Sequence, residues 1–233
     1  MKNLVVLAAV TLILIGATVR ATPAQVVNGS FESGQDPGVN WLFLNSGSNA
    51  MDGWFVSFGT VEYIGGWWQA SDGVRSIDMN GNIAGQISQS ITTTPGVTYE
   101  VAFDMSGNPD GPPSLKEMTV TADGSQAQIF SYDTSLAGNT RPDMRWETKI
   151  YTFTATGSTT LIAFTSEVQG WVFGPALDNV RLLERVEPPT EEPVPIVCHR
   201  NFGKKGQKTL IVSPLDVPAH LAHGDTEGPC VVE

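Results

Sequence analysis

The chain has 233 residues and a formal net charge of −11, with 13 Lys and Arg against 24 Asp and Glu. This length suffices for one domain of ordinary size and an appendage. The acidic balance excludes nucleic acid as a partner, because phosphate binding needs a basic surface. All His and Cys residues lie between Cys198 and Cys230, so the preceding residues cannot build a Ser-His-Asp triad, a Cys nucleophile or a His-ligated zinc site.

The N-terminus has the features of a secretory signal. Met1-Lys2 precedes an apolar run over residues 4–15, and Val19-Arg20-Ala21 offers small residues that a signal peptidase accepts. The alternative, an N-terminal membrane anchor, needs about 20 apolar residues. We therefore expect residues 1–21 to be a cleaved signal, with no membrane span after cleavage and a secreted, extracellular or cell-surface location.

Short segments with a period of two follow, from residue 26 to about residue 184. Apolar residues alternate with polar or small ones, as at Trp54, Val56 and Phe58, and turn-forming pairs such as Asn80-Gly81 separate the segments. This spacing predicts about eight to eleven antiparallel strands. The expected fold is all-β, with a β-sandwich over residues 26–186.

This region carries long motifs at its ends and in its middle. They are NGSFESG from Asn28, VEYIGGWWQASDGVRSIDMNG from Val61, GQISQSITTTPGVTYEVAFDMSGNPDGPP from Gly85, DMRWETKIYTFTATGSTTLIAFTS from Asp143 and GPALDNVRLLE from Gly174. Together they resemble the bacterial choice-of-anchor C proteins, relatives of the plant cell-wall family called domain of unknown function 642. The resemblance covers residues 26–183, although the chain lacks that family's hydrophobic C-terminal sorting helix. It implies a galactose-binding-like jelly roll and an association with cell-wall polysaccharide.

The resemblance also implies a structural calcium ion, which many members of the wider fold hold where the first and last strands meet. The matching positions here are Glu32 and Asp178. A hard cation needs several oxygen ligands, so backbone carbonyls and Asn28 would complete the site. The alternative is that both carboxylates only cap turns and accept backbone N–H groups.

Sugar recognition needs an aromatic platform for a pyranose ring and polar partners for its hydroxyls. Trp67-Trp68 follows a Gly-Gly turn, and a period of two sends the two indoles to opposite faces, so at most one is core. Trp54 and Trp146 are expected to pack in or beside strands. The loop over residues 108–113 supplies polar groups, although it also fits a rigid proline-ended turn. The predicted ligand-binding residues are Trp67, Trp68, Asp72, Arg75, Asn108, Asp110 and Trp171.

An enzymatic interpretation must rest on two carboxylates about 5 to 9 Å apart, as in glycoside hydrolases. Glu62, Asp72, Asp104 and Glu147 are candidates, but nothing in the sequence brackets a pair of them around an aromatic cleft. Acidic residues at this density usually form a solvated face. We therefore expect no catalysis.

The last part of the chain is chemically distinct. Residues 187–195, EPPTEEPVP, form an extended linker, and residues 196–233 form a small module that resembles a C-terminal segment of many secreted bacterial proteins. Pro218 begins a short helix that Gly224 ends, which puts His220 and His223 on one face. One interpretation is a disulfide between Cys198 and Cys230, worth about 3 to 4 kcal/mol by loop closure.

The competing interpretation is a zinc site formed by both Cys with His199, His220 and His223, with Asp225 orienting a histidine. A disulfide combined with a zinc site of the three His alone stays open as well.

The sequence thus predicts a secreted, non-catalytic module that binds cell-wall or extracellular polysaccharide, with calcium and zinc as its possible ions. Two alternatives stay open. One is a structural or adhesion protein with an envelope protein as its partner, and the other is a carboxylate glycoside hydrolase.

Overall fold

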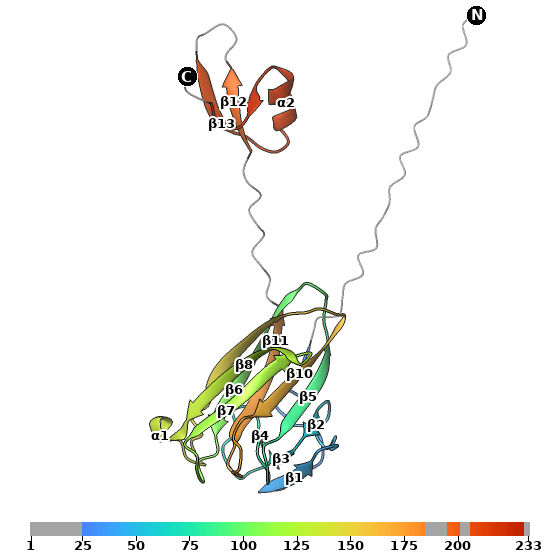
Figure 1. Cartoon of the computed structure of the whole chain (residues 1–233), viewed down its shortest axis with the longest axis vertical. Coiled ribbons are helices and arrows are strands. Elements are labelled where there is room, and N and C mark those ends of the chain that lie inside the picture. The colour runs from blue at the N-terminus through green and yellow to red at the C-terminus, as the bar shows by residue number, and fades with distance from the viewer. Residues whose placement is uncertain (1–24, 185–194, 201–205, 231–233) are drawn as a thin grey trace, which may run out of the picture. The chain divides into compact units, whose positions relative to one another are not determined.

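The computed structural model describes residues 25–184, 195–200 and 206–230, which belong to two compact units that divide at residue 185 (Figure 1). The predicted signal over residues 1–21 lies outside the described residues. So does the predicted linker over residues 187–195, except for Pro195. Within the described ranges, no helix has both the length and the apolar character needed to cross a membrane.

The large unit is a sandwich of two antiparallel sheets. The six-stranded sheet has the order β1 (Trp41–Asn45), β3 (Thr60–Ile64), β4 (Ser76–Asp78), β11 (Pro175–Glu184), β6 (Thr98–Gly107) and β9 (Glu147–Thr154). The five-stranded sheet has the order β2 (Phe55–Phe58), β5 (Gln86–Thr92), β10 (Thr159–Ser166), β7 (Leu115–Ala122) and β8 (Ser125–Asp133). A short helix, α1 (Thr134–Ala137), follows β8. This architecture confirms the predicted all-β jelly-roll sandwich.

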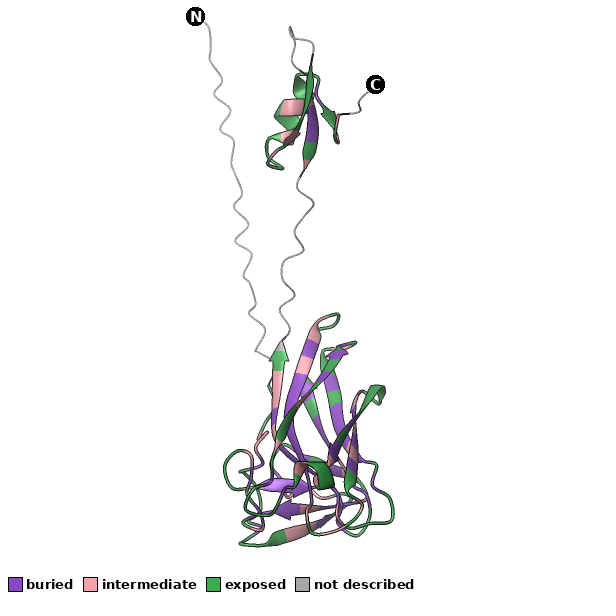
Figure 2. Ribbon diagram, turned by 90° about the vertical axis from the view of Figure 1, so that its left-hand side faces the viewer, coloured by how far each residue is buried: buried purple, intermediate pink, exposed green. Residues whose placement is uncertain are grey.

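Alternating side chains of the strands fill the space between the sheets. In β6, Tyr99, Val101 and Phe103 are buried in the core, and buried residues recur along the strands in Figure 2. Phe103 bridges the two layers, since its ring centroid lies 5.1 Å from that of Phe130 and 5.2 Å from that of Phe164 in the other sheet. The strands form because a period of two gives each of them one apolar face to bury.

The alternation fails at one predicted position. Trp54 and Val56 are core residues as expected, but Phe58 is 60% exposed. The pairing of β2 with β5 is irregular between Val56 and Phe58, so the backbone turns Phe58 away from the core.

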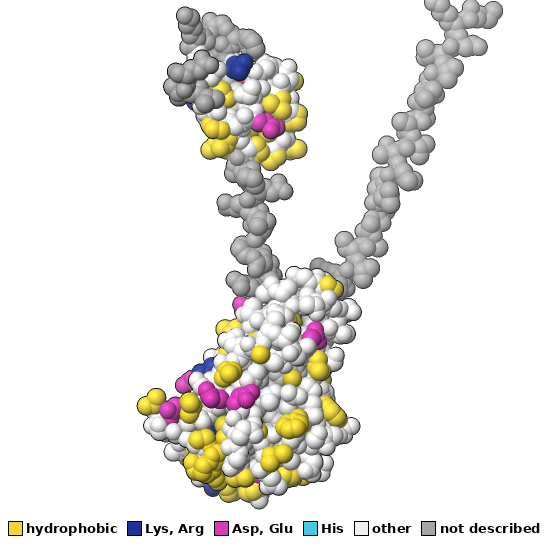
Figure 3. Space-filling model, in the orientation of Figure 1, with side chains coloured by type: hydrophobic (Ala, Val, Ile, Leu, Met, Phe, Trp, Pro, Cys, Tyr) yellow, Lys and Arg dark blue, Asp and Glu magenta, His cyan; other side chains and the backbone are white. Residues whose placement is uncertain are grey.

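The surface of the sandwich carries few basic groups. The face drawn in Figure 3 is mostly uncharged, with acidic side chains gathered near one edge. This face of the sandwich shows no basic patch on which a polyanion could bind.

The small unit is a three-stranded sheet with one helix. Its elements are β12 (Ile196–Arg200), β13 (Gln207–Ile211), α2 (Val217–Ala222) and β14 (Thr226–Glu227), and the sheet order is β13-β12-β14. Cys198 and Cys230 form a disulfide. Among the described residues of this unit only Val197, Cys198 and Asp225 are buried, so the unit has almost no apolar core of its own. A cross-link is therefore important for its stability.

Candidate functional site

Two carboxylates lie side by side on the outer face of the six-stranded sheet. Val61, Tyr63 and Ile77 point into the core, so the alternation sends Glu62 of β3 and Asp78 of β4 to the opposite face. The two residues are direct partners in the pairing of these strands. Like charges on adjacent positions repel each other, and besides burial the negative charge of Glu62 contributes to raising the pKa of Asp78.

A second, smaller apolar cluster forms on this outer face, where two loops pack against β3 and β11. Ile64, Trp68, Met144 and Ala176 are its buried members. The indole N–H of Trp68 donates to Ser76 Oγ at 2.7 Å. The loops that carry Trp68 and Met144 are thereby held against the sheet, although they belong to distant parts of the sequence.

Beside this cluster the outer face holds a cavity of about 430 Å³, which we call the outer-face cavity. Its walls come from β1, β3 and four loops that lie far apart in the sequence. The lining residues are Trp41, Glu62, Trp67, Asn108, Asp110, Arg141, Val172 and Phe173.

The indole of Trp67 is fixed on several sides. Its N–H donates to Asp110 Oδ2 at 3.0 Å, and the guanidinium carbon of Arg141 lies 3.7 Å from the centre of its ring system. Arg141 is paired in turn with Asp110, Nε to Oδ1 at 2.7 Å. Trp41 meets Trp67 edge to face, with 4.8 Å between ring centroids. Because Arg141 covers one face of Trp67, the open aromatic surface of the cavity is Trp41, which is 40% exposed.

Glu62 is the unpaired acid of the outer-face cavity. Burial raises its pKa to about 7, and within the described residues its carboxylate makes no side-chain hydrogen bond or ion pair. Asp78 is fully buried beside it. Burial raises the pKa of Asp78 to about 8, against the opposing effect of a 2.7 Å hydrogen bond from Asn108 Nδ2. Glu62 is therefore the carboxylate that a ligand in this cavity can reach and that no group of the described residues already binds.

A buried lysine joins the two loops at the rim of the cavity. Lys116 Nζ donates to the carbonyl of Gly111 at 2.9 Å and to that of Phe173 at 2.6 Å. Burial lowers the pKa of Lys116 to about 8. The buried amine of Lys116 on β7 thus ties the backbone of Phe173, a residue of the cavity wall, to that of Gly111.

The structure brings together three of the predicted ligand-binding residues, Trp67, Asn108 and Asp110, at the outer-face cavity. Asn108 is buried there and its side chain is used within the protein, since its Oδ1 accepts the N–H of Asp110. Trp68 is only 4% exposed, so its indole belongs to the small apolar cluster and offers no surface platform. Trp67 is half-buried and packs against this cluster from the side of the cavity.

The other predicted ligand-binding residues do not line this cavity. Asp72 is exposed on the loop over residues 71–75. Arg75 on the same loop donates from Nη1 to the hydroxyl of Tyr63 at 2.9 Å and pairs with Asp36 at 3.7 Å. Trp171 is 46% exposed, next to the lining residues Val172 and Phe173.

The carboxylates proposed for calcium bind opposite ends of the loop over residues 71–75. Glu32 Oε1 accepts the N–H groups of Val74 and Arg75, at 2.9 and 2.8 Å. Asp178 Oδ2 accepts the N–H groups of Ser71 and Asp72, at 2.7 and 3.0 Å. Burial raises the pKa of Asp178 to about 7. Both residues therefore act as turn caps here, and calcium at this place stays a prediction.

Of the four candidate acids for catalysis, only Glu62 lines the outer-face cavity. The carboxylate of Asp104 accepts hydrogen bonds from the hydroxyls of Ser71 and Thr148, at 2.6 and 2.7 Å. Glu147 is paired with Lys149 at an exposed position. The second carboxylate of the cavity is Asp110, whose two oxygens are held by Trp67 and Arg141.

Two important lining residues had no role in the sequence-based prediction. Trp41 stands in WLFLN, where alternation with Leu42 and Leu44 could have placed it on an outward face. Arg141 lies in a loop with no period and carries no local signal. Its role arises only because that loop reaches across to Trp67.

In the small unit the disulfide between Cys198 and Cys230 confirms the first of the two sequence interpretations. The structure contradicts zinc ligation by these two residues, because a disulfide has no thiolate to donate. The histidines are brought together nevertheless. His199 Nδ1 and His220 Nδ1 lie 2.8 and 2.7 Å from Asp225 Oδ2.

The fold places the large unit among the jelly-roll β-sandwiches. Residues 24–183 match the family described as "Protein of unknown function (DUF642)", and the chain belongs to this family. The curated protein Halomucin of Haloquadratum walsbyi (strain DSM 16790 / HBSQ001) is 30% identical over 179 residues, which is 75% of this chain. The chain spans only 2% of the length of this curated relative.

Several solved carbohydrate-binding modules are similar in structure. "Family 16 Carbohydrate Binding Module-2" is 19% identical with a TM-score of 0.43, over 68% of this chain and 99% of that one. A family 61 module in complex with beta-1,4-galactotriose is 16% identical with a TM-score of 0.41, over 68% of this chain and 96% of that one. "CBM4 structure and function" describes a third, 18% identical with a TM-score of 0.37, over 69% of this chain and 99% of that one.

Proposed function

We propose that the sandwich is a non-catalytic binding module for cell-wall or extracellular polysaccharide, and that the outer-face cavity is its sugar site. The observation that carries the proposal is the combination of an open indole, Trp41, with an unpaired carboxylate, Glu62, in one cavity. A pyranose packs its C–H face on an aromatic ring, and its hydroxyls need hydrogen-bond partners when they leave water. The cavity offers both kinds of group together.

Each lining residue has a part in this proposal. Trp41 is the stacking platform, and Trp67 is a positioning residue because Asp110 and Arg141 hold its indole. Glu62 accepts hydrogen bonds from sugar hydroxyls, and the free N–H groups of Arg141 donate to others. A volume of about 430 Å³ lies toward the lower end of small-ligand sites. We therefore infer that the cavity takes a chain end or a short stretch of sugar units.

Affinity electrophoresis of the purified chain through gels containing soluble polysaccharides tests this proposal, with calorimetry on any polysaccharide that retards it. Trp41→Ala is expected to weaken binding by at least about tenfold, because the apolar contact of an indole exceeds the 1.4 kcal/mol that a factor of ten requires. Phe58→Ala is the matched control, since it removes an exposed aromatic ring from the other sheet. Equal loss in both variants would contradict the assignment of the site.

Glycoside hydrolysis is the second candidate function, and one observation favours it. Glu62 has a pKa raised to about 7 by burial and shares the cavity with Asp110, as an acid and a second carboxylate do in glycoside hydrolases. Release of reducing sugar from a bound polysaccharide, abolished by Glu62→Gln, would establish it. Binding of the polysaccharide without release of reducing sugar would instead support the non-catalytic module.

We further propose that the protein acts outside the cell. The disulfide supports this location, because such bonds persist in oxidising compartments, and the apolar N-terminal run supports a secretory signal. Fractionation of the producing cells with an antibody to the sandwich checks it. The alternative partner, an envelope protein, gains support if the folded chain binds no polysaccharide yet co-purifies with cell envelopes.

A further inference from the structure

The small unit gathers every histidine of the chain around one buried carboxylate. His199 lies on β12, His220 on α2, and His223 caps the end of that helix. Asp225, just before β14, has a side chain with no exposed surface. One imidazole thus comes from β12 and two from α2 and its C-terminal cap, and their ring centroids are 5.4 to 5.9 Å apart.

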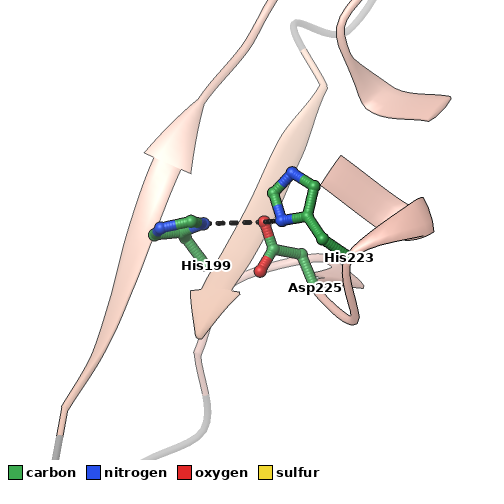
Figure 4. A group of neighbouring side chains, drawn as sticks. All are labelled: His199, His223 and Asp225. Carbon is green, nitrogen blue, oxygen red and sulfur yellow. Dashed lines mark hydrogen bonds and ion pairs between the residues drawn. The ribbon is translucent and has the colours of Figure 1, made fainter. Parts of the chain in front are cut away.

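The nitrogen atoms of this cluster converge on one point. Nδ1 lies 2.8 Å from Asp225 Oδ2 in His199, 2.7 Å in His220 and 4.0 Å in His223. Figure 4 shows His199 and His223 approaching the same carboxylate oxygen from two sides. The ligand atoms of His199, His223 and Asp225 all lie within 4.8 Å of one another.

These separations are close to those of a tetrahedral metal site. Bonds of about 2.0 to 2.1 Å in tetrahedral geometry put ligand atoms about 3.3 Å apart. The three separations from Asp225 Oδ2, at 2.7, 2.8 and 4.0 Å, lie on either side of this value. Each of these three distances would have to change by less than about 1 Å to match tetrahedral geometry.

Hydrogen bonding alone does not account for the third histidine. Asp225 Oδ1 accepts the N–H of Arg200 at 2.8 Å, and Oδ2 is already in contact with His199 and His220. His223 lies too far from Oδ2 for a hydrogen bond, and its side chain is 52% exposed. The bond from Arg200 instead resembles the outer contact that orients a carboxylate ligand in metal sites.

We propose that the small unit binds one divalent transition-metal ion, with zinc as the first choice, through Nδ1 of His199, His220 and His223 and Oδ2 of Asp225. Imidazole suits zinc, copper and nickel, and the disulfide removes thiolates from the ligand set. Four protein ligands close the coordination sphere, which is typical of a structural site. The ion would join β12 to α2 in a unit that has almost no apolar core.

The test uses the full chain with its disulfide intact. Because all three histidines belong to the cluster, selective ¹⁵N labelling of histidine makes every imidazole signal a report on this unit. One equivalent of zinc chloride should shift the Nδ1 resonances of all three rings and leave each Nε2 protonated. Calorimetry should give one zinc ion per chain, with thiol titration showing no free Cys.

His223→Gln is the sharp variant, because this imidazole makes no hydrogen bond to Asp225 and its loss leaves the metal-free unit intact. It should weaken zinc binding by at least about tenfold, the lower end of what losing even an outer-shell partner costs. Asp216→Asn is the matched control, since Asp216 is an exposed acid of the same unit without a capping hydrogen bond. It should bind zinc as the unaltered chain does.

Unchanged histidine resonances in the presence of zinc would overturn the proposal, and this measurement needs no variant to fold. Equal zinc affinity in His223→Gln and Asp216→Asn would overturn it too, because the ion would then lie elsewhere on an acidic chain. Either result leaves a hydrogen-bonded His-Asp cluster. None of these outcomes bears on sugar binding by the sandwich.

Discussion

Two adjacent tryptophans differ in what they contribute. Trp67 forms part of the cavity wall and is held by Asp110 and Arg141, whereas Trp68 is buried and bonded to Ser76. A residue of the cavity wall and a structural anchor thus stand next to each other in the bend that follows β3.

We predict that Trp68→Ala lowers the free energy of unfolding by about 3 to 5 kcal/mol, because it leaves a cavity in the small apolar cluster and an unpaired hydroxyl on Ser76. Trp67→Ala should cost clearly less, since Trp67 is only partly buried. Urea unfolding followed by tryptophan fluorescence measures both, and all six Trp belong to the sandwich. Equal stability of the two variants would show that the Trp68 indole is not a structural anchor.

At the scale of elements, the loop over residues 71–75 is clamped from both sides. Glu32 holds one end and Asp178 the other, through backbone N–H groups. Gly73 between them has φ 69°, a conformation that favours glycine. The two carboxylates thus connect the first described segment and the last strand of the sandwich to the same loop.

A calcium ion at Glu32 and Asp178 would have to bind through the carboxylate oxygen that the loop leaves open on Glu32, together with backbone carbonyls. If it binds, EGTA should lower the midpoint of the tryptophan-fluorescence melt and added calcium should restore it. Glu32→Gln should remove this dependence, whereas Glu147→Gln, an exposed acid elsewhere on the sandwich, should keep it. An identical melt with and without EGTA would eliminate the ion and leave only the turn caps.

At the scale of the whole molecule, buried acids determine how the stability of the sandwich changes with pH. Burial raises the pKa of Glu62 and Asp178 to about 7 and that of Asp78 to about 8. Between about pH 4 and pH 8 the folded state therefore holds protons that the unfolded chain has released, so stability falls as pH rises through this range. Lys116, with its pKa lowered by burial to about 8, acts oppositely and restores stability above that pH.

We accordingly predict a melting temperature of the sandwich that is higher at pH 5 than at pH 8 and rises again toward pH 10. Asp104 has a pKa that hydrogen bonds from Ser71, Thr148 and Asn179 lower in spite of its burial. Its stabilising contribution is therefore present throughout this range and is lost only as the pH falls below about 4. Glu62→Gln should flatten the fall between pH 5 and pH 8. A melting temperature that increases steadily from pH 5 to pH 8 would contradict the burial of these acids.

The alternation of apolar residues was sufficient to predict the sandwich, because a strand with one apolar face has only one way to bury it. Tyr99, Val101 and Phe103 show this directly. The two Cys residues were likewise sufficient to suggest the disulfide, because two cysteines of a secreted protein usually oxidise to a disulfide. Both features depend on local chemistry that a sequence displays.

The candidate sites depended on tertiary structure instead. Trp41, Trp67 and Arg141 share no local pattern, and they meet only because strand pairing and loop packing bring three distant segments to one edge of the sheet. Alternation could not place Trp68 and Phe58 correctly, since packing of a loop on the outer face of the sheet buries the first and an irregular register exposes the second. Contacts between residues far apart in the chain are set by the packing of whole elements, and no short stretch of sequence contains that information.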